Sequence, residues 1–325
     1  MVKSFLISFL CWHFLLQPAF CQNDYFYPDE LIVTATTLNL RESPSIGSAK
    51  MAGLKKGEFL QFIESVNDNE YVEVDSTWGV WLKVRAQGKT GYVFSPYVSG
   101  SYILQYEGQF TDDLPAVNWY GVYKRDSFTD EIRPIRVRLV EEMNEYFGEK
   151  IKVLKTNQRE VSKFIIGSVA PLKIGYAGPL GVFSVHDFFM SSDLAPGSVI
   201  NIQPGNEKND TTFKDSYTLV STGCAQMDAN MVVSVNDYRL TLVDYSSGTP
   251  PHTQDLTPWV KSMIPGMSPT VQLIWYGDID GDNKPDAIIN DFPNEVGGRS
   301  SLFLSSKRRK GEYLRKVCET YFGGD

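Results

Sequence analysis

Residues 31 to 99 alternate between apolar and polar side chains in short runs that are separated by turns. The first run, LIVTATTLNLRESPS, ends in a polar, proline-containing turn at residues 42–45. The next runs are AGLKKGEFLQFIE and VWLKVRAQGKTGYVFSPYVS, and a turn at residues 87–90 divides the second of them. Alternation with a period of two, interrupted by turns at this spacing, predicts short antiparallel strands. We therefore expect a small antiparallel barrel over residues 31–100.

The remainder of the chain, residues 101–325, also has mainly the pattern of strands. Segments such as SKFIIGSVAPLKIGYAGPLGVF, ANMVVSVNDYRLTLVDY and TVQLIWYGDID are apolar runs between Gly, Asn, Asp or Ser turns. Residues 135–147 are ambiguous between a strand and one face of a helix, and only residues 255–264 have the pattern of a short helix. The basic run at 307–310 predicts a solvated hairpin turn. The predicted fold class is mainly β, with a small barrel followed by a larger β-rich domain with few helices.

The start of the chain has a different pattern. Lys3 precedes an apolar stretch from Phe5 to Leu16, and small residues follow near Cys21. A charged start, a short apolar core and a small-residue cleavage site are typical of a secretory signal peptide, so we expect residues 1–21 to be removed and residues 22–30 to form a linker. The apolar stretch is too short to cross a bilayer. We expect an exported protein, periplasmic or extracellular, without a transmembrane segment.

Charge and composition narrow the range of partners and activities. The chain has 31 Lys and Arg against 39 Asp and Glu, a net charge of −8. Nucleic acids and anionic membrane surfaces attract basic proteins, so neither is an expected partner. The whole chain has 3 histidines, and only His186 and His252 follow the predicted signal peptide, which excludes a histidine-rich zinc site. No G-x-S-x-G motif or phosphate-binding loop occurs in the sequence.

The first module carries sequence blocks of a known family. LNLRESPS, LKKGE and WLKVRAQGKTGYVFSPYVS occur in this order, and they closely resemble the blocks of a bacterial SH3-like domain. The resemblance implies a barrel that binds a cell-wall peptide or a partner protein and has no catalytic activity. Trp81 and Tyr92 belong either to the core or to a ligand groove, and core packing is favoured for most aromatic residues of so small a barrel. Trp78 and Tyr97 are the candidates for contact with a ligand.

Four aspartates crowd into residues 278–286. The stretch GDIDGDNKPDAII places Asp278, Asp280, Asp282 and Asp286 ahead of an apolar segment. Like charges at this spacing repel one another unless a cation lies among them. Ca²⁺ takes about six to eight oxygen ligands in irregular geometry, whereas Mg²⁺ demands a stricter octahedron, so the pattern predicts a calcium loop. Lys284 could contribute only its backbone carbonyl to such a site.

The pattern D-x-D-G-D-x-x-x-D before an apolar strand resembles the calcium loop of FG-GAP repeats in β-propellers. The resemblance covers about thirty-five residues, 270–304, and the pattern occurs once in this chain. Ile289 stands where an EF-hand would need a bidentate Glu, so a helix–loop–helix site is excluded. The resemblance implies a structural ion that holds the loop so that its two flanking strands can pair, without a catalytic role.

Cys224 and Cys318 remain after the predicted signal peptide. In an exported protein they either form a disulfide or pack as unpaired thiols. The stretch STGCAQMD around Cys224 faintly resembles the S-x-G-C-x-x-M signature of L,D-transpeptidases, which would make Cys224 a nucleophile and His186 its base. However, Thr222 and Gln226 depart from that signature, and strand-like segments flank it. We therefore expect a non-enzymatic binding or scaffold protein of the bacterial envelope, with a cell-wall cysteine transpeptidase or hydrolase as the alternative.

Overall fold

The structure is a computed structural model of the chain. It describes residues 26–66, 71–109, 114–115, 117–125, 129–144, 148–179, 192–194, 196–202, 217–228, 231–244, 250–260, 271–292 and 297–322. Within these residues the only helical segments are two 3₁₀ turns, at Ser95–Tyr97 and Thr257–Trp259, and nearly all other regular structure is antiparallel strand. The predicted mainly β fold class is confirmed.

The first module is a seven-stranded antiparallel sheet in the order β3-β2-β8-β7-β4-β1-β9. Its strands are β1 (Glu30–Val33), β2 (Thr37–Arg41), β3 (Lys50–Lys55), β4 (Phe59–Ser65), β7 (Trp81–Ala86), β8 (Lys89–Phe94) and β9 (Val98–Gly100). A separate short hairpin is made by β5 (Val72–Val74) and β6 (Thr77–Gly79). The inward positions of nearly all the strands supply one core of mostly Leu and Val side chains, so the sheet must curl around it. The alternation that predicted strands is therefore the alternation between this core and solvent.

The described residues of the rest of the chain build three further sheets and one projecting hairpin. The first sheet has the order β10-β15-β11-β12-β16, the second β17-β22-β23-β24-β25, and the third β18-β19-β20-β21. The first consists of β10 (Tyr102–Gln105), β11 (Asn118–Lys124), β12 (Thr129–Pro134), β15 (Phe164–Ser168) and β16 (Gly175–Pro179). The second consists of β17 (Ser192–Asp193), β22 (Gln272–Gly277), β23 (Asp286–Asp291), β24 (Gly298–Leu304) and β25 (Arg315–Phe322). The third consists of β18 (Val199–Ile202), β19 (Tyr217–Asp228), β20 (Met231–Asp244) and β21 (His252–Asp255).

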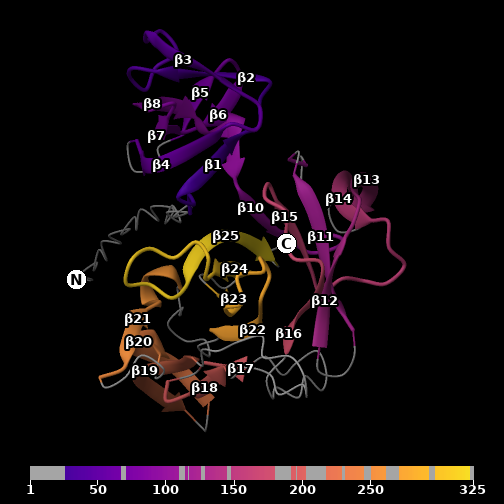
Figure 1. Cartoon of the computed structure of the whole chain (residues 1–325), viewed down its shortest axis with the longest axis vertical. Coiled ribbons are helices and arrows are strands. Elements are labelled where there is room, and N and C mark those ends of the chain that lie inside the picture. The colour runs from indigo at the N-terminus through magenta and orange to yellow at the C-terminus, as the bar shows by residue number, and fades with distance from the viewer. Residues whose placement is uncertain are drawn as a thin grey trace, which may run out of the picture.

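The sheet of β17 and β22–β25 is the central layer of this region (Figure 1). Ile288 and Leu302 lie in a core shared with the β10–β16 sheet. Their chain neighbours Ile289 and Phe303 lie in a second core shared with the β18–β21 sheet. Because successive side chains of a strand point to opposite faces, a strand covered on both sides must bury every position, and β24 does so along its whole length. The Asp-rich loop therefore connects two strands of the most buried layer of the molecule.

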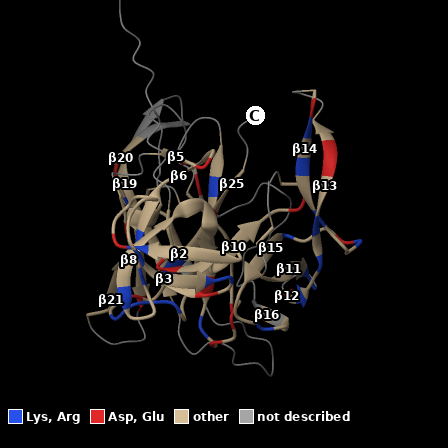
Figure 2. Ribbon diagram, turned by 90° about the horizontal axis from the view of Figure 1, so that it is seen from above, with Lys and Arg blue, Asp and Glu red and all other residues tan. Residues whose placement is uncertain are grey.

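The structure decides one ambiguous expectation in this region and corrects another. Residues 137–144 and 149–156 form the strands β13 (Val137–Asn144) and β14 (Glu149–Thr156) of an antiparallel hairpin, so the strand interpretation holds. Figure 2 shows this hairpin projecting from the body, with acidic residues on β13 beside basic residues on β14, and two ion pairs join the strands. The helix expected at residues 255–264 is wrong over its described part. Leu256 donates its backbone N–H to Leu240 at 2.8 Å, so this segment pairs with β20 and continues only into a 3₁₀ turn.

The basic turn between β24 and β25 joins the first module to the rest of the chain. Lys307 forms an ion pair with Glu30 at 2.9 Å, and Arg309 and Arg315 each reach Asp29 at 2.9 Å. Arg309 is exposed, as expected for a solvated turn, but the run is also a contact with the start of the barrel. The two modules nevertheless keep separate hydrophobic cores.

Candidate metal centre and ligand-binding surface

The Asp-rich loop is the connection between β22 and β23. Gly277 at the end of β22 pairs with Asp286 at the start of β23, so residues 278–285 form a hairpin loop. Gly281 and Asn283 have φ angles of 83° and 59°, in the left-handed region that glycine and asparagine tolerate better than other residues. These two positions turn the chain sharply enough to bring the first and last aspartates of the stretch together.

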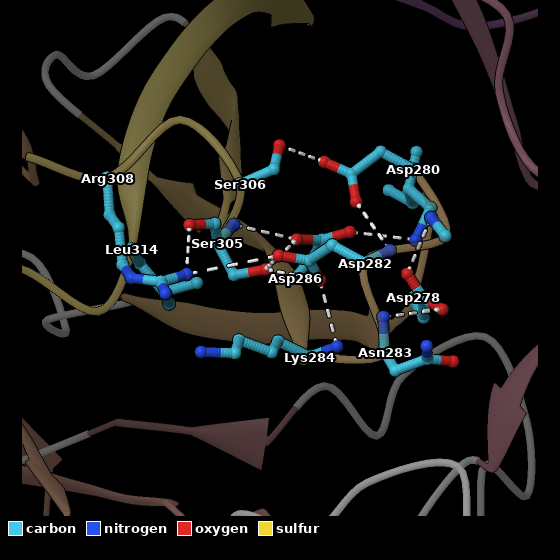
Figure 3. Close-up of polar contacts among 12 residues, drawn as sticks. Asp278, Asp280, Asp282, Asn283, Lys284, Asp286, Ser305, Ser306, Arg308 and Leu314 are labelled. Atoms are coloured by element: carbon cyan, nitrogen blue, oxygen red, sulfur yellow. Dashed lines mark hydrogen bonds and ion pairs between the residues drawn. The ribbon is translucent and has the colours of Figure 1, made fainter.

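Three of the four aspartates converge on one point (Figure 3). One carboxylate oxygen from each of Asp278, Asp280 and Asp286 lies within 4.8 Å of the other two. Ca²⁺ binds oxygens at about 2.3–2.6 Å, so two ligands of one ion can be separated by up to about 5 Å. The spacing of the three oxygens therefore fits a single ion bound among them.

Backbone and side-chain donors hold these carboxylates in place. Asp286 accepts hydrogen bonds from the backbone N–H groups of Ile279 at 2.7 Å and Ser305 at 2.8 Å. Asp278 accepts one from the backbone N–H of Gly281 at 2.7 Å, and Lys173 donates to its second oxygen at 2.9 Å. The carboxylates of both Asp278 and Asp286 are wholly buried. These hydrogen bonds fix the positions of the two buried carboxylates within the loop.

The predicted ligands Asp282 and Lys284 are placed differently. The carboxylate of Asp282 accepts hydrogen bonds from the Ser305 hydroxyl at 2.9 Å and from the backbone N–H of Lys284 at 2.8 Å. Its second oxygen lies 3.9 Å from Arg308. Asp282 is therefore not one of the three converging carboxylates, and its part in metal binding, like that of the Lys284 carbonyl, stays a prediction.

Sequence reasoning missed the partners that the rest of the chain brings to the loop. Ser305 and Ser306 follow β24. The Ser305 hydroxyl lies within hydrogen-bonding distance of both Asp282 and Asp286 and can donate to either, and the Ser306 hydroxyl donates to Asp280. Lys173 lies more than a hundred residues before the loop in the chain. No local motif marks these residues, because their role depends on which strands become neighbours in the folded sheet.

The four aspartates of the loop outnumber the cationic side chains that form ion pairs with them. Burial, followed by the charge of Asp280, raises the pKa of Asp286 well above its ordinary value. The pKa of Asp280 is also raised, chiefly by burial. Among the ion pairs of the described residues, only Lys173 and Arg308 meet the four aspartates, which leaves two negative charges without a partner when all four are ionised. A divalent cation would supply the missing charge.

The barrel has a shallow hollow on its surface. It has a volume of about 260 Å³, and its walls are Pro44, Ser45, Ile46, Val66, Val72, Glu73, Val74 and Trp81. Trp81 is 9% exposed and packs against Phe94 with 5.3 Å between ring centroids, so it belongs to the buried part of the barrel and also forms part of this wall. The hollow is otherwise mostly apolar.

The two predicted ligand-contacting aromatic residues lie outside the walls of this hollow. Tyr97 is half-buried, packs against the barrel core, and its ring centroid lies 6.1 Å from that of Phe94. Trp78 on β6 is 61% exposed. Their contact with a ligand stays a prediction, and Trp78 is the more accessible of the two.

Neither alternative expected for the cysteines holds for both residues, since packing as an unpaired thiol describes Cys318 but is wrong for the exposed Cys224. Cys224 and Cys318 are both free, so a disulfide between them is wrong. Cys318 lies in the core between the first and central sheets, where burial raises the pKa of its thiol, whereas Cys224 is exposed on β19 of the third sheet. His186, the suggested base, lies outside the described residues.

Comparison with known proteins identifies the first module. Residues 36–99 match the family described as Bacterial SH3 domain, which confirms the resemblance for the barrel. Neither the curated proteins nor the solved structures contain a match to the chain. In the described part of the chain, no helix has the length and apolar character needed to cross a membrane.

Proposed function

We propose that this chain is an exported binding or scaffold protein of the bacterial envelope, in which the SH3-like barrel binds a cell-wall peptide. The observation that carries the proposal is the family match over residues 36–99, since bacterial SH3 domains are cell-wall binding modules. The exposed ring of Trp78 and the apolar hollow beside Trp81 offer a surface of the kind that binds short ligands.

We also propose that Ca²⁺ binds the loop of residues 278–286 as a structural ion. Asp278, Asp280 and Asp286 would hold it, and the two unpaired negative charges of the loop match its charge. The ion would neutralise the buried carboxylates of Asp278, just after β22, and Asp286, at the start of β23. It would also tie the β22–β23 hairpin to Ser305 and Ser306 after β24. Its proposed role is in stability and not in a reaction.

The proposal includes no catalytic role. A cysteine enzyme needs its nucleophile within reach of a base. Cys224 pairs across the sheet with Asn236, and His252 packs its ring against Tyr313 on the β24–β25 connection. These contacts favour an ordinary strand position for Cys224.

Sedimentation with purified bacterial cell walls tests the binding function. The full chain is expected to pellet with the walls in a saturable manner, and Trp78→Ala is expected to weaken the affinity by about tenfold or more, as for an exposed aromatic anchor. Met143→Ala, which truncates a similarly exposed apolar side chain on β13, should bind like the unchanged chain. Failure of the unchanged chain to pellet at any wall concentration would refute the proposed function.

A further inference from the structure

The β5–β6 hairpin holds a carboxylate and a large aromatic ring side by side. Glu73 on β5 and Trp78 on β6 are direct cross-strand partners. The two turn residues, Asp75 and Ser76, have φ angles of 49° and 62°, and both are positive as a two-residue type I′ turn requires. The two residues that flank such a turn form a hydrogen-bonded cross-strand pair. Hydrogen-bonded and non-hydrogen-bonded pairs alternate along an antiparallel ladder, and the side chains of a non-hydrogen-bonded pair lie closer together. Glu73 and Trp78 form the next pair after the flanking one, which is of the non-hydrogen-bonded kind.

Both side chains of the pair face solvent. Trp78 has the largest exposed fraction, 61%, among the large apolar side chains in the described part of the barrel, and Glu73 is also exposed. Glu73 is not a member of any ion pair found among the described residues. An aromatic face attracts a cation through its quadrupole, and a carboxylate attracts it through charge. The two groups together suit a primary ammonium group.

The hollow next to the pair offers an apolar surface for the rest of a ligand. Glu73 contributes to its wall together with Val72, Val74 and Trp81. Its volume of about 260 Å³ lies just below the range of about 300–1,000 Å³ for pockets that enclose drug-sized ligands. A short stretch of peptide with small or apolar side chains fits such a space, whereas a glycan chain would exceed it.

The charge of the surrounding sequence favours a cationic ligand over an anionic one. Residues 57–82 contain 6 acidic residues and no Lys or Arg. A field of one sign attracts ligands of the opposite sign and raises their association rate. The ligand that complements this surface therefore carries one cationic group and has apolar groups next to it.

We infer that the Glu73–Trp78 pair recognises the free side-chain amine of a cell-wall stem peptide, whose neighbouring residues lie in the hollow beside Trp81. This inference rests on the proposed cell-wall function and adds to it the ligand group and the two residues that select it. Glu73 supplies a charge-assisted hydrogen bond to the ammonium, and Trp78 covers its other side with the ring face.

Titration of the full chain with a matched pair of peptides tests the inference. The probes are the N-terminally acetylated, amidated stem pentapeptide N-acetyl-L-Ala-D-isoGln-L-Lys-D-Ala-D-Ala, whose only amine is that of the lysine, and the same peptide acetylated on that amine as well. Binding is followed by NMR through the tryptophan indole signals. The unchanged chain is expected to prefer the free amine by about tenfold, the value of one hydrogen bond to a charged group. Glu73→Gln should reduce this preference to about one, whereas Glu141→Gln, an exposed carboxylate on β13, should preserve it.

The outcomes separate this inference from the function on which it rests. Equal affinity for the two peptides, or a preference that survives in Glu73→Gln, would overturn amine recognition even if the chain still pellets with cell walls. Absence of binding both to the peptides and to the walls would instead remove the proposed function itself. A preference that weakens as salt is raised, and disappears in Glu73→Gln at every salt concentration, supports the inference.

Discussion

Calcium at a hundredfold excess over its dissociation constant is expected to raise the free energy of unfolding of the larger β region by about 2.7 kcal/mol. The reason is mass action, because an ion that binds only the folded state stabilises that state. Unfolding separates Asp278, Asp280 and Asp286, which come from both ends of the β22–β23 loop, and so destroys the site. Differential scanning calorimetry with calcium and with a chelator measures the shift.

Asp280→Asn isolates the contribution of one ligand. Asp280 is only partly buried, so the variant should fold, but it should lose most of the calcium-dependent shift. Asp237→Asn is the matched control, since Asp237 is exposed on β20 and has a φ of 53° that asparagine also accepts. Mg²⁺ should substitute poorly because it demands a compact octahedron of ligands. No heat of calcium binding and no change in melting temperature would show that the loop is only a polar turn.

Arg299→Met is expected to lower the free energy of unfolding by about 3–5 kcal/mol, the usual cost of breaking a buried ion pair on one side. Arg299 on β24 donates from Nε to Asp291 at 2.8 Å, and a second guanidinium N–H donates to the other oxygen of the same carboxylate. A third guanidinium nitrogen lies 3.3 Å from Glu319 on β25. Burial alone lowers the pKa of Arg299, but the hydrogen bonds and charges of Asp291 and Glu319 raise it on balance. The substitution would remove both hydrogen bonds that Arg299 donates to the buried Asp291 carboxylate.

Urea denaturation of two further variants identifies the cause of this loss. Arg85→Met removes an exposed arginine of the barrel and should change the free energy of unfolding by no more than about 0.5 kcal/mol. The double variant Arg299→Met, Asp291→Met replaces both charges by apolar side chains and should recover much of the loss. A double variant as unstable as the single one would show that packing of the arginine stem, and not the loss of its hydrogen bonds to the buried Asp291 carboxylate, determines the effect.

The strands of this protein were predictable because their signals are local. In the barrel, the apolar positions of LNL on β2 and WLKV on β7 predict which side chains lie in the core. The core residues on these strands include Leu38, Leu40, Leu82 and Val84. The Asp-rich loop was predictable for the same reason, since its residues are consecutive and lie between two pairing strands. Where the determining contacts are close in the sequence, the pattern predicted the structure.

The features that could not be predicted depend on contacts between distant segments. Arg299 and Ser300 on β24 look like solvent-facing residues, yet both are buried because a sheet covers each face of the central layer. Residues 255–260 have a helical pattern, but pairing of Leu256 with Leu240 determines their conformation. In the same way, Lys173 and Ser305 reach the aspartates only through the stacking and order of strands.

The most direct test of a non-enzymatic wall-binding protein measures binding and turnover together. The full chain is incubated with isolated cell walls for hours, and the pelleted protein, the soluble fragments released and the cross-links of the recovered walls are all quantified. We predict that the protein pellets with the walls, that no fragments are released, and that the cross-links match those of untreated walls. Release of fragments or a change in cross-links that disappears in Cys224→Ser would contradict the account and establish the cysteine enzyme.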